Sequence, residues 1–515
     1  MVGAARPGKR RHAVRDCLAE ASAPAGAPPS NKTVARRDEM NTPSHSMNRL
    51  SAAAKTALGV GTLASFFGYV GIYSMATPVY QMTLGVNPFW LGVALFIPRV
   101  LDAFFDPLMG KISDNTRSRW GRRRPYIVLG AVLMGITYGA VWMVPAGWSD
   151  FAKLAYFVLS SILFFIGYTI FGVPYSSLTY EITPDYHERT SVMAFCSFFQ
   201  KSGELVYQFI FPLSQLAIFA SKLQGVRVVN WMVGLVFMAG IGMLPGLLVR
   251  ERFQHVAERQ EPVKLWASVG DALRHRPFFV LIILTILNVL AGMFASSLDY
   301  YVLVYYMFDG NLAGGSWWKG FLSAGYAIVG FVAIPIVVWI SGRLGKRRAL
   351  IAIYGLTFAG GIAKWFVFSP RHPWLIFLDP VFCGPIWIAV NVLMASMLAD
   401  ICDEDELVSG QRREGMFGAI FSWVQKMAVS LSFLGTGLTL QLSGFDQKLG
   451  GHQSSGTFTI MRLLLVGSAS VTAVLAMVAL RYYTLTAERA AETRQILESR
   501  RSAAAGMPSA GLSGA

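Results

Sequence analysis

The chain has 515 residues, of which 54% are hydrophobic and only 14% are charged, whereas a soluble domain carries roughly 25% charged residues. A single core stops growing beyond about 250 to 300 residues, so the apolar surplus argues against a soluble fold and indicates a polytopic membrane protein. The formal charge of +16 then favours basic loops on one side of a membrane, and no nucleic-acid partner is needed to explain it. The four cysteines show no metal or redox spacing, which argues against a disulfide framework.

Residues 1–50 are rich in Ala, Pro, Ser and Arg and contain no apolar run. This composition predicts a disordered tail without the apolar region of a signal peptide. Met40 and Met47 lie just before the first apolar stretch, so a translation start at Met1 or at either of these methionines fits the sequence.

Twelve apolar stretches follow, each of about the length that a helix needs to cross roughly 30 Å of hydrocarbon. They are expected at 56–83, 88–110, 125–146, 152–178, 190–219, 229–249, 278–307, 317–341, 349–368, 373–399, 415–442 and 458–481. The pattern predicts an all-α membrane protein with two six-helix halves. Its parts are a tail over 1–50, a first half over 51–250, a polar connector over 251–277, a second half over 278–483 and a tail over 484–515.

Basic residues are unevenly distributed among the loops. The even-numbered loops carry 19 Lys and Arg, and the odd-numbered loops carry six. Because cytoplasmic loops are enriched in Lys and Arg, this bias predicts that both termini and the even-numbered loops are cytoplasmic. We therefore expect a multi-pass protein of the plasma (cell inner) membrane.

The two halves resemble each other weakly. The sequence Gly-Arg-Arg-Arg begins at Gly121, 64 residues after Ala57 in the first span, and Gly-Lys-Arg-Arg begins at Gly345, 67 residues after Phe278 in the seventh. Acidic residues recur at similar offsets further along each half. Basic loops occur in any multi-span protein, but two matching offsets favour an internal repeat of six helices.

The second expected span contains a charged cluster. Arg99, Asp102 and Asp106 lie three and four residues apart, which places them on one face of a helix near its middle. Two carboxylates one turn apart in a low-dielectric region need a proton, a bound Na⁺ or a basic side chain to compensate them. Pro107 also frees the carbonyl of Ala103. The alternative is that Arg99 forms an inert ion pair.

Further polar groups lie in other spans and are candidate substrate contacts together with Arg99. Lys201 and Glu204 stand one turn apart and either pair with each other or face a cavity. Asp299 and Tyr300 begin a tyrosine-rich segment that suits a sugar, or an interfacial tyrosine belt. We interpret Lys364 and Asp379, which lie nearer the outer ends of their spans, as snorkelling residues, as listed here for comparison with the structure.

Charged residues at the expected cytoplasmic helix ends form a candidate gate. Salt bridges between the halves at these positions would hold an outward-open state and break when the inner side opens. Solvated surface charge explains many of them equally well. The candidate gate residues are Asp114, Arg117, Arg189, Asp400, Arg412 and Glu414.

The loop over 110–125 reads GKISDNTRSRWGRRRP and follows a DAFFDP segment. This pattern resembles the glycoside-pentoside-hexuronide:cation symporters of the major facilitator superfamily, whose best-known member is the melibiose permease. The likeness continues at EITPDYHERT over 181–190 and at ADICDEDE over 399–406, and it covers about residues 51–483. The resemblance implies the major facilitator fold with twelve transmembrane helices and symport by alternating access.

The resemblance also implies roles for single residues. Asp102 and Asp106 match the cation-coordinating carboxylates, Thr169 matches a hydroxyl near them, and Lys426 matches a buried lysine that faces them. Sugar-binding positions of the melibiose permease are replaced, so sugar recognition differs or the substrate is another compound. The replaced positions are Phe66, Gly172 and Ser197.

Three functions remain open. The first is symport of a sugar, glycoside or uronide with Na⁺ or H⁺; the second is transport of an amphipathic lipid such as a lysolipid; the third is a non-transporting sensor. An enzyme is not expected, because there is no phosphate-binding loop and all seven histidines lie in loops or tails. We expect no cofactor, no metal beyond a possible Na⁺ at Asp102 and Asp106, and a monomer in the lipid bilayer.

Overall fold

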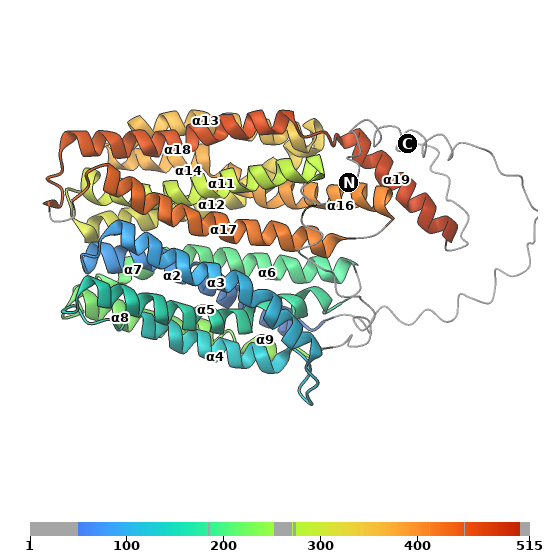
Figure 1. The fold of residues 1–515 in the computed structure, drawn as a ribbon, viewed down its shortest axis with the longest axis horizontal. Helices are drawn as coiled ribbons and strands as arrows, with labels where there is room; N and C mark the ends of the chain where they lie inside the picture. The colour runs from blue at the N-terminus through green and yellow to red at the C-terminus, as the bar shows by residue number, and fades with distance from the viewer. Residues whose placement is uncertain are drawn as a thin grey trace, which may run out of the picture.

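The computed structural model describes residues 50–183, 186–251, 270, 274–410, 413–446 and 449–504. The described residues form a bundle of long helices without a strand (Figure 1). Helices satisfy all of their backbone hydrogen bonds internally, which a chain in hydrocarbon requires. The expected N-terminal tail and most of the connector lie outside the described residues.

The N-terminal half contains six successive helical segments. They are α2 (Ala52–Ala76) with η1 (Thr77–Thr83), α3 (Pro88–Asn115), α4 (Arg124–Val141), α5 (Asp150–Glu181), α6 (Tyr186–Tyr207) with α7 (Ile210–Ser214), and α8 (Lys222–Met232) with η2 (Val233–Gly240) and α9 (Leu244–Leu248).

The C-terminal half repeats this series. It consists of α11 (Arg276–Tyr301) with η4 (Val302–Met307), α12 (Leu312–Leu344), α13 (Lys346–Val367), the broken helix η5 (Pro373–Phe377), α14 (Leu378–Cys383), α15 (Pro385–Ala389), η6 (Val390–Met394) and α16 (Ala395–Ser409), then α17 (Glu414–Leu442) and α18 (Ser455–Arg481). The expected C-terminal tail contains a further helix, α19 (Ala487–Ala504).

Eleven helical segments among the described residues are long and apolar enough to cross a membrane. The expected span over 190–219 is the one that does not meet this criterion. Its helix, α6, has 22 residues but is polar, and it carries Lys201 and Glu204 in its second half. We therefore interpret α6 as a helix that needs its neighbours to shield its charges from lipid.

The structure confirms the internal repeat that the sequence indicates. Asn87 caps the start of α3 with its side chain, and Asn311, 224 positions later, caps α12 in the same way. Gly121 and Gly345, also 224 positions apart, both have positive φ, at 105° and 79°, a conformation that glycine adopts without strain. The chain from the start of α3 to the next turn is thus repeated in α12 without a gap.

Close packing between α4 and α5 depends on small residues. A Cβ atom on Gly130 would lie 2.3 Å from the backbone nitrogen of Phe171, and one on Gly167 would lie 2.8 Å from the backbone nitrogen of Met134. Without a hydrophobic driving force in lipid, helices associate through such close contacts. The two glycines therefore set the distance between these helices.

Replacing Gly130 by alanine is expected to lower the free energy of unfolding by about 1 to 3 kcal/mol, the usual cost of overpacking. Gly355, on α13, is a matched control because a Cβ there meets no atom within 4 Å. The Gly355→Ala variant should be unchanged or stabilised by up to about 1 kcal/mol through helix propensity. Thermal denaturation of the purified variants in detergent measures both effects, and equal melting temperatures would contradict this role of Gly130.

The halves contact each other at the end of the bundle away from the start of α2, which we call the far end. The Tyr301 hydroxyl, on α11, donates a hydrogen bond to Gln81 at the end of η1. The ring of Phe209 lies 6.1 Å from that of Trp317 and 5.8 Å from that of Phe321. These contacts close the bundle at the far end.

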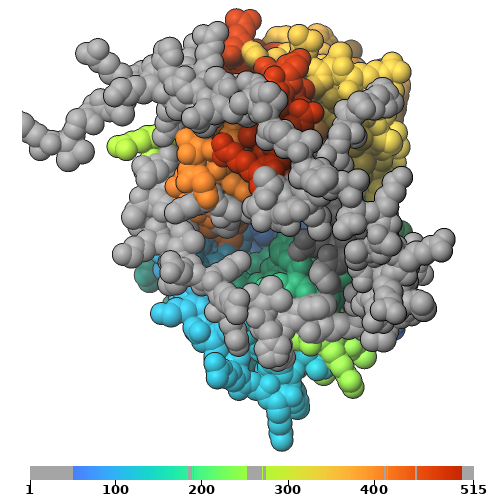
Figure 2. Space-filling view, turned by 90° about the vertical axis from the view of Figure 1, so that its right-hand side faces the viewer, coloured from blue at the N-terminus to red at the C-terminus, as the bar shows by residue number. Residues whose placement is uncertain are grey.

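The opposite end, where α2 begins and α18 ends, is called the termini end. Figure 2 looks onto it, with the N-terminal half below and the C-terminal half above. Between the grey atoms the surface is hollowed where the two halves face each other, and green helices of the N-terminal half lie deep in this hollow. Contacts at one end and a hollow at the other describe a bundle that is open toward the termini end.

Candidate functional site

The charged cluster expected on the second span lies in the middle of α3. The side chains of Arg99 and Asp102 are fully buried, and Arg99 Nη1 lies 3.0 Å from Asp102 Oδ2. Aromatic rings surround the guanidinium, with its central carbon 4.8, 5.3 and 5.4 Å from the centroids of Tyr69, Tyr73 and Phe165. The guanidinium is therefore held by one ion pair and by cation–π contacts, which gain strength where water is excluded.

Lys426 reaches this cluster from the other half of the protein. Its Nζ lies 2.9 Å from Asp102 Oδ2, and it also forms an ion pair with Asp106. From α5, the Thr169 hydroxyl lies 2.8 Å from Asp102 Oδ1 and 3.3 Å from Asp106 Oδ1. The structure thus brings together all four predicted cation-binding residues, and Lys426 joins the two halves through them.

The cluster contains two acidic and two basic side chains and is formally neutral. Carboxylate and hydroxyl oxygens are suitable ligands for Na⁺, and either carboxylate can instead take a proton. Asp106 is the accessible one, with 32% of its side chain exposed, whereas Asp102 is buried. In this arrangement the Lys426 ammonium occupies the space between the carboxylates, so a cation that binds both of them must displace it.

No group of three or more His, Cys, Asp or Glu side chains suited to a metal ion occurs in the part of the chain that the structure describes. Within the same part, Arg99 Nε and Nη2 are buried without a hydrogen-bond partner. Arg99 is predicted as a substrate contact, but its side chain is closed off by the aromatic rings in this conformation.

Lys201 and Glu204 form an ion pair on α6, with Nζ and Oε2 2.6 Å apart. Their side chains are 20% and 28% exposed, and α6 packs here against α12 of the other half. Lys201 Nζ would lie 3.9 Å from a Cβ atom on Gly330 of α12. The pair is therefore located between the halves and remains open to a solute.

Asp299 and Tyr300 contact residues of their own half. Lys319 Nζ, on α12, lies 2.5 Å from Asp299 Oδ1, and the Tyr300 hydroxyl lies 2.8 Å from the Ser316 hydroxyl. Both Asp299 and Tyr300 are buried. The structure does not bring them into the Asp102 cluster, and the partner Lys319 was not identified from the sequence.

The prediction that Lys364 and Asp379 snorkel toward the membrane surface was wrong. Lys364 Nζ lies 2.6 Å from Asp379 Oδ2, and the two side chains are only 3% and 1% exposed. The Tyr326 hydroxyl donates a second hydrogen bond, of 2.7 Å, to the same carboxylate oxygen. A position near the outer end of a span favours snorkelling, but α13 and α14 pack together and bury both charges as a pair.

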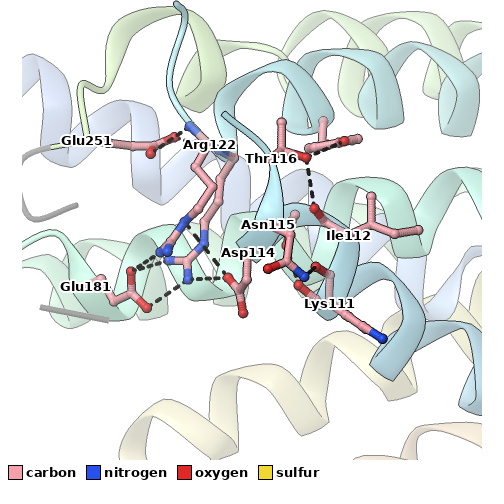
Figure 3. Close-up of polar contacts among 12 residues, drawn as sticks. Lys111, Ile112, Asp114, Asn115, Thr116, Arg122, Glu181 and Glu251 are labelled. Atoms are coloured by element: carbon pink, nitrogen blue, oxygen red, sulfur yellow. Dashed lines mark hydrogen bonds and ion pairs between the residues drawn. The ribbon is translucent and has the colours of Figure 1, made fainter. Parts of the chain in front are cut away.

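The candidate gate residue Asp114 belongs to a network at the termini end of the N-terminal half (Figure 3). Its carboxylate lies 3.0 Å from Arg123 Nη2, and Glu181 binds Arg123 and Arg122 from the end of α5. Glu251 accepts hydrogen bonds from three successive backbone N–H groups at the start of α4, which complements the helix dipole. The sequence did not single out Glu251.

Burial alone lowers the pKa of the Arg123 guanidinium, but the hydrogen bonds to Glu181 and Asp114 outweigh it, and the pKa is raised above its usual value. The network is therefore charged at every physiological pH. It fixes the end of α5 to the turn before α4.

The C-terminal half repeats this network. Asp400 forms ion pairs with Lys346 and, through Arg494 of α19, with the terminal helix. The partners given for Asp114 and Asp400 all come from their own halves. Arg117 is exposed, and the side chains of Arg189, Arg412 and Glu414 lie outside the description. A salt bridge between the halves at this end thus stays a prediction.

The arginines after the two turn glycines also behave alike. Arg124 donates to the carbonyls of Gly246 and Leu247 at the end of α9, and Arg347 donates to the carbonyl of Arg481 at the end of α18. Each loop therefore ties the third helix of its half to the sixth.

Comparison with known proteins identifies relatives along most of the chain. The sequence profile of a family described as MFS/sugar transport protein matches residues 57–487. The uncharacterized symporter YnaJ of Bacillus subtilis is 25% identical, covering 89% of this chain and 97% of its own. The isoprimeverose transporter of Lactiplantibacillus pentosus is 25% identical over 74% and 77%, and the sodium-dependent lysophosphatidylcholine symporter 1 of Gallus gallus is 23% identical over 92% and 92%.

Solved structures share the fold. A bacterial homolog of the human lysosomal transporter Spinster, in an inward-facing conformation, superposes with a TM-score of 0.60 at 15% identity over 86% of this chain and 97% of its own. The D-xylose-proton symporter gives a TM-score of 0.56 at 14% identity over 82% and 96%. At these identities the likeness establishes the architecture of twelve helices in two halves as a shared fold, and nothing about the substrate.

Proposed function

Because the chain belongs to the MFS/sugar transport protein family, we propose that it is a secondary active symporter of a sugar, glycoside or uronide, driven by Na⁺ or H⁺. The observation that carries this proposal is the contact of Lys426, from the C-terminal half, with Asp102 and Asp106 of the N-terminal half. A cation that replaces the ammonium between these carboxylates breaks the only bond described here in which one charged side chain of each half meets the other at mid-span. Cation binding is thereby linked to the relative position of the halves.

The proposed cycle follows from this competition. In the conformation described, the bundle is closed at the far end by Gln81 and Tyr301 and hollow at the termini end. When a cation binds to the two aspartates, Lys426 is released and the halves are free to rock around the substrate. Because linkage is reciprocal, the cation tightens substrate binding by the same factor by which the substrate tightens cation binding.

The orientation follows from the loop charges. We place the termini end and both tails in the cytoplasm and the far end outside the cell, in a plasma (inner) membrane. Relatives include a protein named inner membrane symporter YicJ from Escherichia coli. The unit of transport is proposed to be a monomer without an organic cofactor, since each half completes the site of the other.

A ligand-stability screen tests the proposed function. The melting temperature of the purified protein is measured with glycosides, pentosides and uronides, each with Na⁺ and with K⁺ at several pH values. A symporter should show a solute-dependent rise in melting temperature of about 2.7 kcal/mol in stability at a hundredfold excess over Kd, and this rise should depend on Na⁺ or on pH. A rise that is the same under every cation condition would contradict coupling.

Transport of a lysolipid is the second candidate. Phe66, at a position where the melibiose permease binds sugar, packs edge-on against Phe67 and Tyr207 at centroid distances of 6.4 and 6.3 Å. An aromatic wall of this kind suits an acyl chain better than a sugar hydroxyl, and one relative is named a lysophosphatidylcholine symporter. Competition for uptake by lysophosphatidylcholine, and not by glycosides, would favour this candidate over the first.

A further inference from the structure

The internal repeat maps the cation site of the N-terminal half onto a second place in the molecule. The capping asparagines and turn glycines of α3 and α12 fix their alignment at 224 positions without a gap. In this alignment Asp102 corresponds to Tyr326, and Asp106 corresponds to Gly330. The second place therefore lacks both carboxylates.

The surroundings of Gly330 match those of Asp106. Asp106 lies 3.3 Å from the hydroxyl of Thr169 on α5, and a Cβ atom on Gly330 would lie 3.5 Å from Ile388 on α15. Thr169 and Ile388 correspond to each other, because each lies 12 residues before the acid that binds the basic turn of its half. The second place thus has the same geometry as the cation site, with an apolar side chain where the first has a hydroxyl.

The lysines correspond as well. Lys426 on α17 crosses from the C-terminal half to Asp106, and Lys201 on α6, 225 positions earlier, crosses from the N-terminal half to Gly330. Lys426 meets two carboxylates on the opposite helix. Lys201 meets none there and instead bonds to Glu204 of its own helix.

We propose that this second place, formed by Lys201, Gly330 and Tyr326, is a subsite for an anionic group of the transported solute. A carboxylate, sulfonate or phosphate on the solute takes the position that the Asp106 carboxylate has in the cation site. Lys201 has three N–H donors, of which the described bonds use one, and its side chain is partly exposed between the halves. The solute therefore reaches the ammonium without a rearrangement of the core.

Charge balance supports an anion at this place. The Asp102 cluster is neutral with Lys426 in it, so a bound coupling cation adds one positive charge between the halves. An uncompensated charge at this depth in a membrane protein is costly. A solute that brings one negative charge to Lys201 restores neutrality in the loaded transporter, and Glu204 remains available to accept hydrogen bonds from solute hydroxyls.

This inference rests on the proposed symport, and pairs of solutes that differ in one charge test it. The pairs are methyl β-D-glucuronide and methyl β-D-glucoside, glucose 6-phosphate and glucose, and lysophosphatidate and monoacylglycerol, which separate a sugar acid, a sugar phosphate and a lipid headgroup as the source of the anion. Dissociation constants are measured by thermal shift on the full chain in Na⁺. At least one anionic member should bind about tenfold more tightly than its neutral partner; equal binding within every pair, or no binding by any anion, would overturn the inference.

Two variants of one residue locate the subsite. Gly330→Asp gives Lys201 a permanent counter-ion and should weaken binding of the preferred anion about tenfold, whereas Gly330→Asn adds the same bulk without charge and should have a much smaller effect. The space around Gly330 admits a Cβ atom at ordinary contact distance, so both variants are expected to fold. Equal effects of the two variants would overturn the assignment to Lys201.

A separate readout keeps the proposed function distinct. The stabilisation by Na⁺ or protons without any solute depends on Asp102 and Asp106 and should persist in both Gly330 variants. If this stabilisation is absent from the unmodified protein, the coupled symport itself fails. If it is present and no anion is preferred, only the anionic subsite fails.

Discussion

Replacing Asp102 by asparagine is expected to abolish concentrative uptake. The variant removes the carboxylate that binds Arg99, Lys426 and Thr169 together, so the coupling cation loses its central ligand. A carrier without coupling only equilibrates its solute, and the ratio of internal to external solute should fall to about 1. Uptake of the solute identified by the stability screen into proteoliposomes, with an imposed cation gradient, measures this ratio.

Loss of folding is a competing explanation, because Asp102→Asn also leaves Arg99 without its counter-ion. The Asp106→Asn variant separates the two, since it keeps the Arg99–Asp102 pair and changes a carboxylate that is 32% exposed. It should retain its fold and lose the stabilisation by the cation. Asp309→Asn is the matched control: Asp309 is exposed in a loop with a φ of 50° that asparagine tolerates equally. Accumulation at the unmodified level in both site variants would refute the assigned cation site.

Replacing Asp379 by asparagine should cause the largest loss of stability. The change leaves the Lys364 ammonium buried without a counter-ion, and breaking a buried pair in this way typically costs about 3 to 5 kcal/mol. Thermal denaturation in detergent measures the loss. Since Asp379 is remote from the Asp102 cluster in the chain fold and belongs to the C-terminal half, the stabilisation by the coupling cation should survive in the fraction that remains folded.

The double variant Lys364→Met, Asp379→Leu removes both charges. It should recover most of the stability, because apolar side chains of similar size replace buried ion pairs at little cost. Asp150→Asn is the comparison at an exposed pair: Asp150 is 59% exposed beside Lys153, and its loss should change stability by less than about 1 kcal/mol. A double variant as unstable as Asp379→Asn would show that the pair contributes more than charge compensation.

The sequence was sufficient to predict the parts of the molecule that depend on local pattern. Apolar length predicted the helices, and a spacing of three and four placed Arg99, Asp102 and Asp106 on one face. The contact of Lys426 with this face is 320 residues distant in sequence from Asp106, and it was anticipated only through the resemblance to a family. Thr169 was anticipated in the same way.

Contacts between helices could not be predicted from pattern. Lys364 and Asp379 each resemble a residue that reaches for the membrane surface, and only the packing of α13 on α14 shows that they neutralise each other. Lys319, Glu251 and Arg494 carry no signal in a single sequence, because a basic or acidic residue near a helix end is usually solvated. The correspondence of Lys201 with Lys426 was also missed, since it becomes visible only when both lysines are seen to cross to the opposite half.

The neutrality of the cluster formed by Arg99, Asp102, Asp106 and Lys426 has a consequence for energy coupling. A neutral interface carries no charge through the electric field when the empty protein reorients, so the membrane potential should neither drive nor slow that return step. Moving one elementary charge across 100 mV is worth about 2.3 kcal/mol. Net current during transport therefore reports the charge of the solute: it appears with a neutral solute and vanishes with a monovalent anion.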